Sequence, residues 1–100
     1  MIVVRNVFRL KFGKAREAVA ILKEGVAIQR RLGMAAKDIR LLTDLTGPFY
    51  TLILEITLPS LSELEASMPK FMGDKDFQAN YQKFSPLVDS GFREILNIVD

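Results

Sequence analysis

The spacing of apolar residues changes along the chain, and each change marks an element boundary. Alternation of side chains between two faces is clear from Val4 onward, and one face holds Val4, Asn6, Phe8, Leu10 and Phe12. A period of two predicts a strand over residues 2–12. After Gly13 the apolar spacing becomes three and four, which predicts an amphipathic helix over residues 15–32, closed by Gly33. Gly25 lies near its apolar face, where we expect close packing on a sheet to offset the low helix propensity of glycine.

The second half of the chain repeats this change of period. Alternation over residues 39–46 and 49–58, with Gly47-Pro48 between them, predicts an antiparallel hairpin. Ser60-Leu61-Ser62-Glu63 has the capping-box pattern of a helix start, and Pro69 and Gly73 predict that this helix is interrupted. A further helix is expected over residues 74–84. Ser90-Gly91 is expected in a connection before a last strand over residues 92–99.

The predicted order is β-α-β-β-α-β, with the second helical region broken. This order is that of the ferredoxin-like α+β fold, in which a four-stranded antiparallel sheet carries both helices on one face. One hundred residues suffice for one compact domain, so residues 1–100 are predicted to form a single domain.

The uncovered face of such a sheet should be mostly polar, and here it is not. The chain is 49% hydrophobic. The apolar residues assigned to the uncovered face are Val3, Val7, Leu42, Phe49, Ile53, Ile95 and Val99, and the polar ones are Arg5, Arg9, Asp44, Glu55, Arg93 and Asn97. A patch of this kind is typical of an interface, so we expect a homodimer that packs through its sheet faces. The alternative is that some of these residues occupy edge positions.

Composition excludes several kinds of chemistry. The chain has no Cys, His or Trp, which removes disulfides, thiolate sites and the commonest metal ligand and general base. We expect neither a metal nor another cofactor. No segment has the uninterrupted apolar length of a membrane span, and Arg5 and Arg9 interrupt the first residues where a signal peptide is apolar. A cytoplasmic protein without membrane contact is therefore expected.

The segment Phe8-Arg9-Leu10-Lys11-Phe12-Gly13-Lys14-Ala15, followed by an amphipathic helix, resembles the opening of the dimeric α+β barrel superfamily. Antibiotic biosynthesis monooxygenases and NIPSNAP-like proteins open with a similar R-x-K-x-G-K motif. The closing Gly91-Phe92-Arg93-Glu94-Ile95-Leu96 is similar to their last strand. The resemblance implies a homodimer of ferredoxin-like protomers, each with a mostly apolar pocket between sheet and helices.

The resemblance also implies a function class. The chain is expected to bind a small apolar or aromatic metabolite, either without catalysis or as a cofactor-independent monooxygenase-like enzyme. Haem-degrading members share an Asn on the first strand, which Asn6 matches, but they also use a Trp and a His that this chain lacks. Haem breakdown of that type is therefore not expected.

Candidate site residues follow from the elements that carry them. The candidates for catalysis are Glu94, Asn6 and Tyr81, and those for ligand binding are Phe8, Tyr50, Leu54, Phe71, Met72 and Phe77. A carboxylate among apolar neighbours can serve as a base, and Glu94 is expected on the helix-covered side. The alternative for Glu94 and Glu55 is an ion pair with Arg5, Arg9 or Arg93. The alternative for Asn6 and the aromatic residues is ordinary packing.

Two other function classes share this element order. Residues 1–40 have a net charge of +7 and residues 41–100 one of −5, so a basic half could contact RNA. RNA-recognition domains stack bases on aromatic residues of their central strands, and Ile53 and Glu55 stand where such residues are needed. Nucleic acid is therefore not the expected partner. A ligand-sensing or dimerisation module of the ACT type is the third possibility, although such modules normally accompany a catalytic domain.

Overall fold

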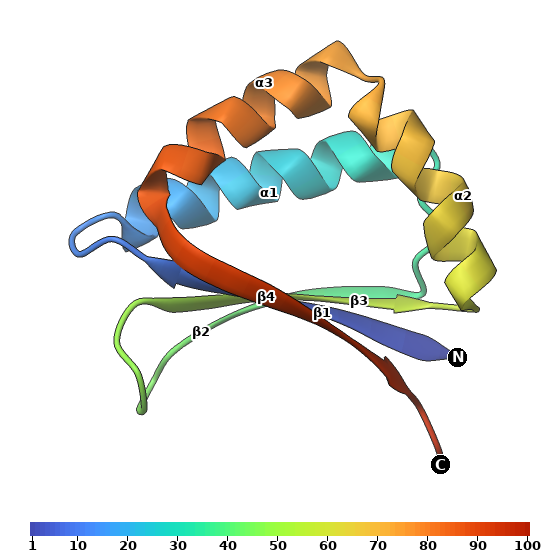
Figure 1. The fold of residues 1–100 in the computed structure, drawn as a ribbon, viewed down its shortest axis with the longest axis horizontal. Helices are drawn as coiled ribbons and strands as arrows, with labels where there is room; N and C mark the ends of the chain where they lie inside the picture. Colours follow the sequence, from blue (N-terminus) through green and yellow to red (C-terminus); the bar gives the residue numbers. More distant parts are fainter.

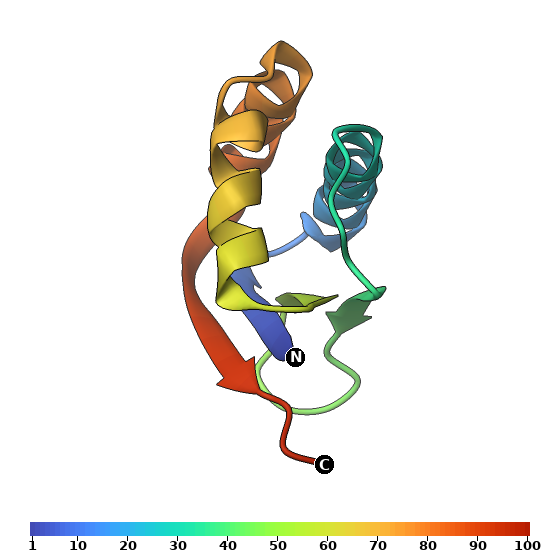
Figure 2. The same ribbon diagram turned by 90° about the vertical axis from the view of Figure 1, so that its right-hand side faces the viewer.

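The computed structural model describes all 100 residues as one sheet beneath a layer of helices. The sheet contains β1 (Ile2–Leu10), β2 (Asp38–Thr43), β3 (Thr51–Leu58) and β4 (Val88–Asn97). The helices are α1 (Ala15–Arg31), α2 (Leu61–Met72) and α3 (Lys75–Phe84), and the short 3-10 helix η1 (Ser85–Leu87) leads into β4. Figures 1 and 2 show that all three helices lie on the same side of the sheet.

The strand order is β2-β3-β1-β4, and every neighbouring pair is antiparallel. The two central strands are therefore β1 and β3, the two with the clearest apolar alternation. This is the ferredoxin-like arrangement that the sequence predicts, with the second helical region divided into α2 and α3.

Local sequence explains how the helices begin and end. The Ser60 side chain accepts a hydrogen bond from the Glu63 backbone N–H at 3.4 Å, as the capping box predicts. The Asp74 carboxylate caps α3 by accepting from the Phe77 N–H at 2.9 Å. Pro69 lies inside α2 without ending it, and the break between α2 and α3 comes at Gly73. None of the helices is both long enough and apolar enough to cross a membrane.

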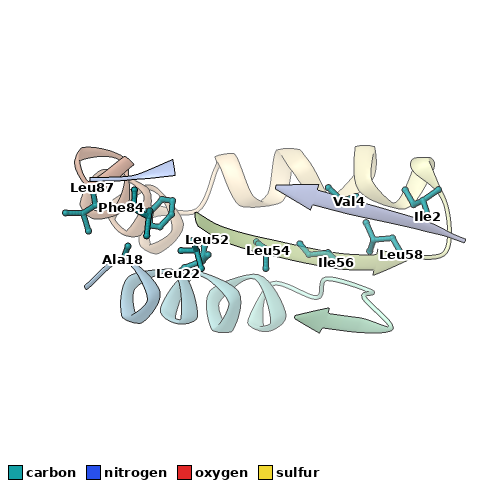
Figure 3. Close-up of a cluster of buried hydrophobic side chains, with 11 residues drawn as sticks. Ile2, Val4, Ala18, Leu22, Leu52, Leu54, Ile56, Leu58, Phe84 and Leu87 are labelled. Atoms are coloured by element: carbon teal, nitrogen blue, oxygen red, sulfur yellow. The ribbon is translucent and has the colours of Figure 1, made fainter. Parts of the chain in front are cut away.

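The core lies between the sheet and the helices. Figure 3 shows the helix-facing side chains of β1 and β3 clustered with Ala18 and Leu22 of α1, Phe84 of α3 and Leu87 of η1. Val4, Leu52 and Leu58 are the largest side chains buried almost completely. The rings of Phe8 and Phe84 meet edge to face, with centroids 5.0 Å apart. Burial alternates strictly along β3, which explains why this strand is easily predicted.

Several predicted boundaries are wrong at the ends of strands. β1 ends at Leu10, two residues earlier than expected, and Phe12 is 78% exposed. β2 spans residues 38–43 rather than 39–46, and β3 begins at residue 51 rather than 49. β3 does not extend back to residue 49 because Tyr50 has a φ of 59°, outside the range of an extended strand. Leu45 and Phe49 consequently lie in an exposed loop, not in the sheet.

The last strand differs most from its prediction. β4 begins at Val88, so Ser90-Gly91 lies within the strand and not in a connection. Gly91 pairs with Phe8, and a Cβ at this position would lie 3.0 Å from the Val7 carbonyl oxygen and 3.2 Å from the Phe8 ring. Glycine is present here because β1 approaches closely, not because the chain turns.

The two faces of β4 are also predicted the wrong way round. The pairing of β4 with β1 shows which of its residues lie on which face of the sheet. Arg5 pairs with Glu94 and Asn6 with Arg93. Paired residues of antiparallel strands share a face. Glu94 therefore lies on the open face of the sheet, together with Phe92 and Leu96. The residues of β4 on the helix-covered side, which were assigned to the open face, are Arg93, Ile95 and Asn97.

Candidate functional site

A cavity of about 300 Å³ lies between the sheet and the helices. Fourteen of its twenty lining residues are hydrophobic. The sheet contributes its floor, and the floor residues are Val4, Asn6, Phe8, Leu54, Ile56, Leu58 and Arg93. Residues of α1, α2 and α3 complete the walls. A mostly apolar cavity with a few polar groups is the usual form of a small-molecule site.

The break between α2 and α3 shapes one wall of this cavity. The rings of Phe71 and Phe77, on either side of Gly73, stack with centroids 5.7 Å apart and an interplanar angle of 28°. Phe71 is buried, whereas Met72 and Tyr81 are 57% and 61% exposed. All four residues line the cavity, so its wall runs from the buried interior to the surface.

Asn6 and Arg93 form the main polar feature of the cavity. They are paired on adjacent strands, and the Arg93 Nε–H donates to the Asn6 side-chain oxygen at 2.7 Å. Because a guanidinium group only donates, the oxygen of Asn6 must face it and the amide nitrogen must point elsewhere. That amide nitrogen makes no hydrogen bond within the chain. Arg93 is exposed, which indicates a place at the mouth of the cavity.

Asn80 is a buried amide of the cavity wall, and it joins α3 to α1. Its nitrogen donates to the Ile21 carbonyl oxygen at 2.8 Å. A Cβ on Gly25 would lie 2.6 Å from the Asn80 side-chain oxygen. Gly25 thus permits close packing, as expected, but its neighbour is α3 and not the sheet. Ser67, also buried, donates to the Glu63 carbonyl oxygen at 2.8 Å within α2.

Arg93 lines the cavity and has no carboxylate partner. No Asp or Glu lines the cavity. Arg5 and Arg40 pair with carboxylates on the open face, and Arg31 pairs with Asp74 and Asp76. Arg93 and Tyr81 are the titratable side chains of the cavity lining. Its fixed charge is therefore positive.

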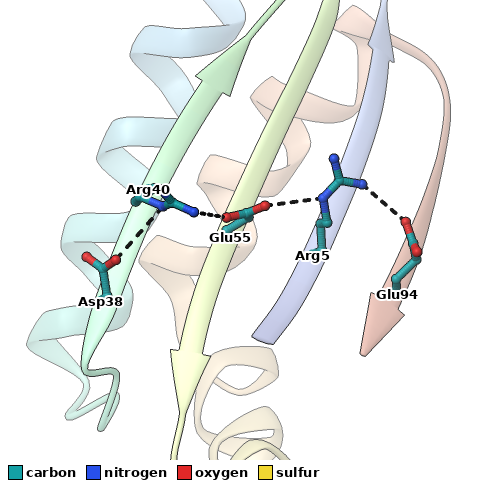
Figure 4. Close-up of polar contacts among 5 residues, drawn as sticks. All are labelled: Arg5, Asp38, Arg40, Glu55 and Glu94. Atoms are coloured by element: carbon teal, nitrogen blue, oxygen red, sulfur yellow. Dashed lines mark hydrogen bonds and ion pairs between the residues drawn. The ribbon is translucent and has the colours of Figure 1, made fainter. Parts of the chain in front are cut away.

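The open face carries a continuous row of ion pairs (Figure 4). Glu55 accepts from Arg40 at 2.6 Å and from Arg5 at 3.2 Å, and Arg5 also donates to Glu94 at 3.2 Å. Asp38 lies 3.9 Å from Arg40. The ion pairs expected as the alternative for Glu55 and Glu94 are thus observed, both with Arg5. The expectation that Glu94 faces the helices is wrong.

Seven of the nine candidate residues line one cavity, and two do not. The seven are Asn6, Phe8, Leu54, Phe71, Met72, Phe77 and Tyr81. Glu94 lies on the opposite face of the sheet. Tyr50 lines a separate depression between α1 and the loop after β2, where its ring meets Phe12 at 4.9 Å between centroids. That depression is larger, at about 730 Å³, but nine residues line it, against twenty around the cavity under the helices. Because fewer residues surround it, this depression is the less favourable place for a bound small molecule.

Arg93 and Asn80 are among the cavity residues that the sequence analysis did not name as site residues. Arg93 was assigned to the wrong face, and only the register of β4 against β1 corrects that. Asn80 lies one residue before the candidate Tyr81, and its isolated polarity on a packed helix was the available signal. Elsewhere, no group of three or more acidic side chains is arranged to hold a metal ion.

Comparison with known proteins finds similarity in structure. No family model matches the chain, and no curated protein matches its sequence. A NIPSNAP family protein from Agrobacterium tumefaciens is 27% identical, with a TM-score of 0.86 over 99% of this chain and 93% of that one. An uncharacterized NIPSNAP domain protein from Burkholderia xenovorans is 21% identical, with a TM-score of 0.86 over 99% and 95% of the two chains.

A more distant similarity extends to a second group. A structure described as an antibiotic biosynthesis monooxygenase is 14% identical, with a TM-score of 0.76 over the full length of both chains. These similarities agree with the resemblance in the opening and closing segments of the sequence. The chain therefore has the ferredoxin-like α+β fold of the NIPSNAP and antibiotic biosynthesis monooxygenase-like proteins.

Proposed function

We propose that this protein binds a small, mostly apolar or aromatic molecule in the cavity between its sheet and helices. The observation that carries the proposal is the cavity itself, with about 300 Å³ of space behind mostly hydrophobic walls. An apolar cavity of roughly 150 Å³ is enough to hold benzene. A molecule of one or two aromatic rings therefore matches the available volume.

The enzymatic form of the proposal is a cofactor-independent, monooxygenase-like reaction on that molecule. In such a reaction a substrate methylene and O₂ give a carbonyl and water, so the substrate supplies both hydrogens of the water and all four electrons that reduce O₂. Asn6 and Tyr81 line the cavity and would contact the substrate. Glu94, on the open face, would not. The similarity to antibiotic biosynthesis monooxygenases supports this form through the fold alone.

Filling the cavity tests the proposal directly. Ser67 is buried in α2 and lines the cavity, so Ser67→Phe should occupy its volume. Ser62→Phe makes the same substitution at an exposed position of the same helix and serves as the control. Equilibrium dialysis against 2-naphthalenemethanol, a neutral two-ring probe, should give retention by the wild type and by Ser62→Phe. Retention should fall at least several-fold in Ser67→Phe, and equal retention by all three proteins would contradict the proposal.

We also propose that two copies of the chain pack through the open faces of their sheets. Three large apolar residues of that face are partly exposed, at 58% for Phe92, 46% for Leu96 and 36% for Leu42. The row from Arg40 to Glu94 alternates in sign, so the face is complementary to a copy of itself. Exposed apolar surface of this kind is typical of protein interfaces.

Sedimentation velocity tests the dimer. The wild type should sediment as a dimer at micromolar concentration, and Phe92→Lys should shift it toward the 11.3 kDa monomer. Phe12→Lys replaces an exposed phenylalanine outside the sheet and should leave the dimer intact. A wild-type protein that sediments as a monomer would refute this proposal.

The central strands offer little support for RNA binding. On the open face, β1 presents Val3, Arg5, Val7 and Arg9, and β3 presents Thr51, Ile53, Glu55 and Thr57. Neither set contains an aromatic side chain on which a base could stack. The small-molecule proposal is therefore preferred.

A further inference from the structure

We infer that the molecule in the cavity is an organic anion, specifically a carboxylate attached to a one- or two-ring apolar body. This inference rests on the proposed function and adds the charge of the ligand. It starts from Arg93, whose side chain lines a mostly apolar cavity and has no carboxylate partner in the chain.

The orientation of Arg93 favours a carboxylate over other polar groups. Its Nε–H is already donated to Asn6 at 2.7 Å, which fixes the plane of the guanidinium group. The terminal nitrogens make no hydrogen bond within the chain. A guanidinium end presents two parallel N–H donors, and the two oxygens of a carboxylate match that geometry. The amide nitrogen of Asn6 provides one further donor beside it.

The rest of the cavity agrees with an anionic head and an apolar body. No carboxylate lines the cavity, so nothing there repels a negative charge or competes for Arg93. The floor residues Val4, Leu54 and Ile56 and the stacked rings of Phe71 and Phe77 offer only apolar contacts. A ligand would therefore direct its rings toward the interior and its charge toward the exposed Arg93.

Paired probes separate charge from shape. Two acids, benzoate and 2-naphthoate, are compared with the matching alcohols, benzyl alcohol and 2-naphthalenemethanol, by NMR titration of the isotope-labelled full chain. The Nε–H signal of Arg93, identified by its loss in Arg93→Gln, should shift with the acids and much less with the alcohols. At least one acid should bind about ten-fold more tightly than its alcohol, the effect expected of a charge-assisted hydrogen bond at a partly exposed site.

Three variants give the inference its controls. Arg93→Gln should remove the preference, so that each acid binds about as tightly as its matching alcohol. Asn6→Asp is isosteric and places a competing carboxylate beside Arg93, so it should reduce acid binding by a similar factor. Arg16→Gln changes another exposed arginine, in the separate depression, and should have no effect.

The outcomes distinguish this inference from the proposed function. Alcohols and acids that bind equally, or an acid preference that survives Arg93→Gln, would overturn the anionic ligand and leave the cavity as a binding site. Absence of any shift at cavity residues with all four probes would overturn the cavity function and this inference together.

Discussion

The contact between Gly25 and Asn80 makes a quantitative prediction about the packing of α1 on α3. Alanine normally stabilises the middle of a helix by about 1 kcal/mol relative to glycine. Here a Cβ at position 25 would lie 2.6 Å from the Asn80 side-chain oxygen, whereas ordinary contact begins at 3.4 Å. Asn80 is 7% exposed and donates a hydrogen bond to Ile21, so it can move away only by weakening that bond. We therefore expect Gly25→Ala to destabilise the fold.

The magnitude follows from three opposing effects. The required displacement would break or weaken the 2.8 Å bond from Asn80 to Ile21, a loss of about 1 kcal/mol. Forcing a methyl group into this close contact costs about 1–3 kcal/mol, and the gain in helix propensity offsets about 1 kcal/mol of this. The expected net loss is about 1–3 kcal/mol, or roughly 4–8 °C in Tm for each kcal/mol in a domain of this size.

A double-mutant cycle measures the contact itself. Urea unfolding followed by circular dichroism would be recorded for the wild type, Gly25→Ala, Asn80→Ala and the double variant. When Asn80 is alanine the close contact is absent, so Gly25→Ala should become neutral or stabilising by up to about 1 kcal/mol. The reasoning is refuted if Gly25→Ala is as stable as the wild type, or if its effect is the same in both backgrounds.

Three further substitutions test other parts of the fold by urea unfolding. Gly91→Ala should destabilise by about 1–3 kcal/mol, because its Cβ would lie 3.0 Å from the Val7 carbonyl oxygen; no measurable loss would show that β1 and β4 can separate there. Asp74→Ala removes the cap of α3 and should cost about 1 kcal/mol, whereas unchanged stability would mean that the cap is not formed. Glu55→Gln should destabilise by about 1 kcal/mol, since this carboxylate, 15% exposed, bridges two arginines. Glu65→Gln, on the surface of α2, should have no effect, and an equal loss in both glutamine variants would contradict that role of the ion-pair row.

The central strands and the first helix could be predicted from the sequence because each has one clearly apolar face. In β3 every helix-facing residue is apolar and buried, so alternation alone identifies the strand. The candidate residues on α2 and α3 could be predicted to share one cavity because of the break between the two helices. A broken helix leaves space over a sheet, and Phe71 and Phe77 flank the break.

The faces of β4 could not be predicted in this way. Both of its faces carry large apolar residues, Phe92 and Leu96 on one and Ile95 on the other, so alternation does not choose between them. The choice comes from pairing with β1, a contact between the two ends of the chain. The same pairing brings Arg93 to Asn6, which is why the principal charge of the cavity was missed.

The separate depression is the remaining alternative location for a ligand. It includes Tyr50, and its surroundings expose Leu45 and Phe49 at 97% and 71%. The cavity under the helices is preferred because helices and sheet surround it and because Asn6 and Arg93 meet in its lining. The two locations share no lining residue, so an experiment can distinguish them.

The most direct test of the account is to locate a bound aromatic molecule by intermolecular nuclear Overhauser effects. With 2-naphthoate bound to the full chain, the ring protons should give contacts to methyl groups of Leu54, Ile56 and Leu58, on the floor of the cavity. Contacts confined to Val19 and Ala20 of the separate depression would contradict the central claim.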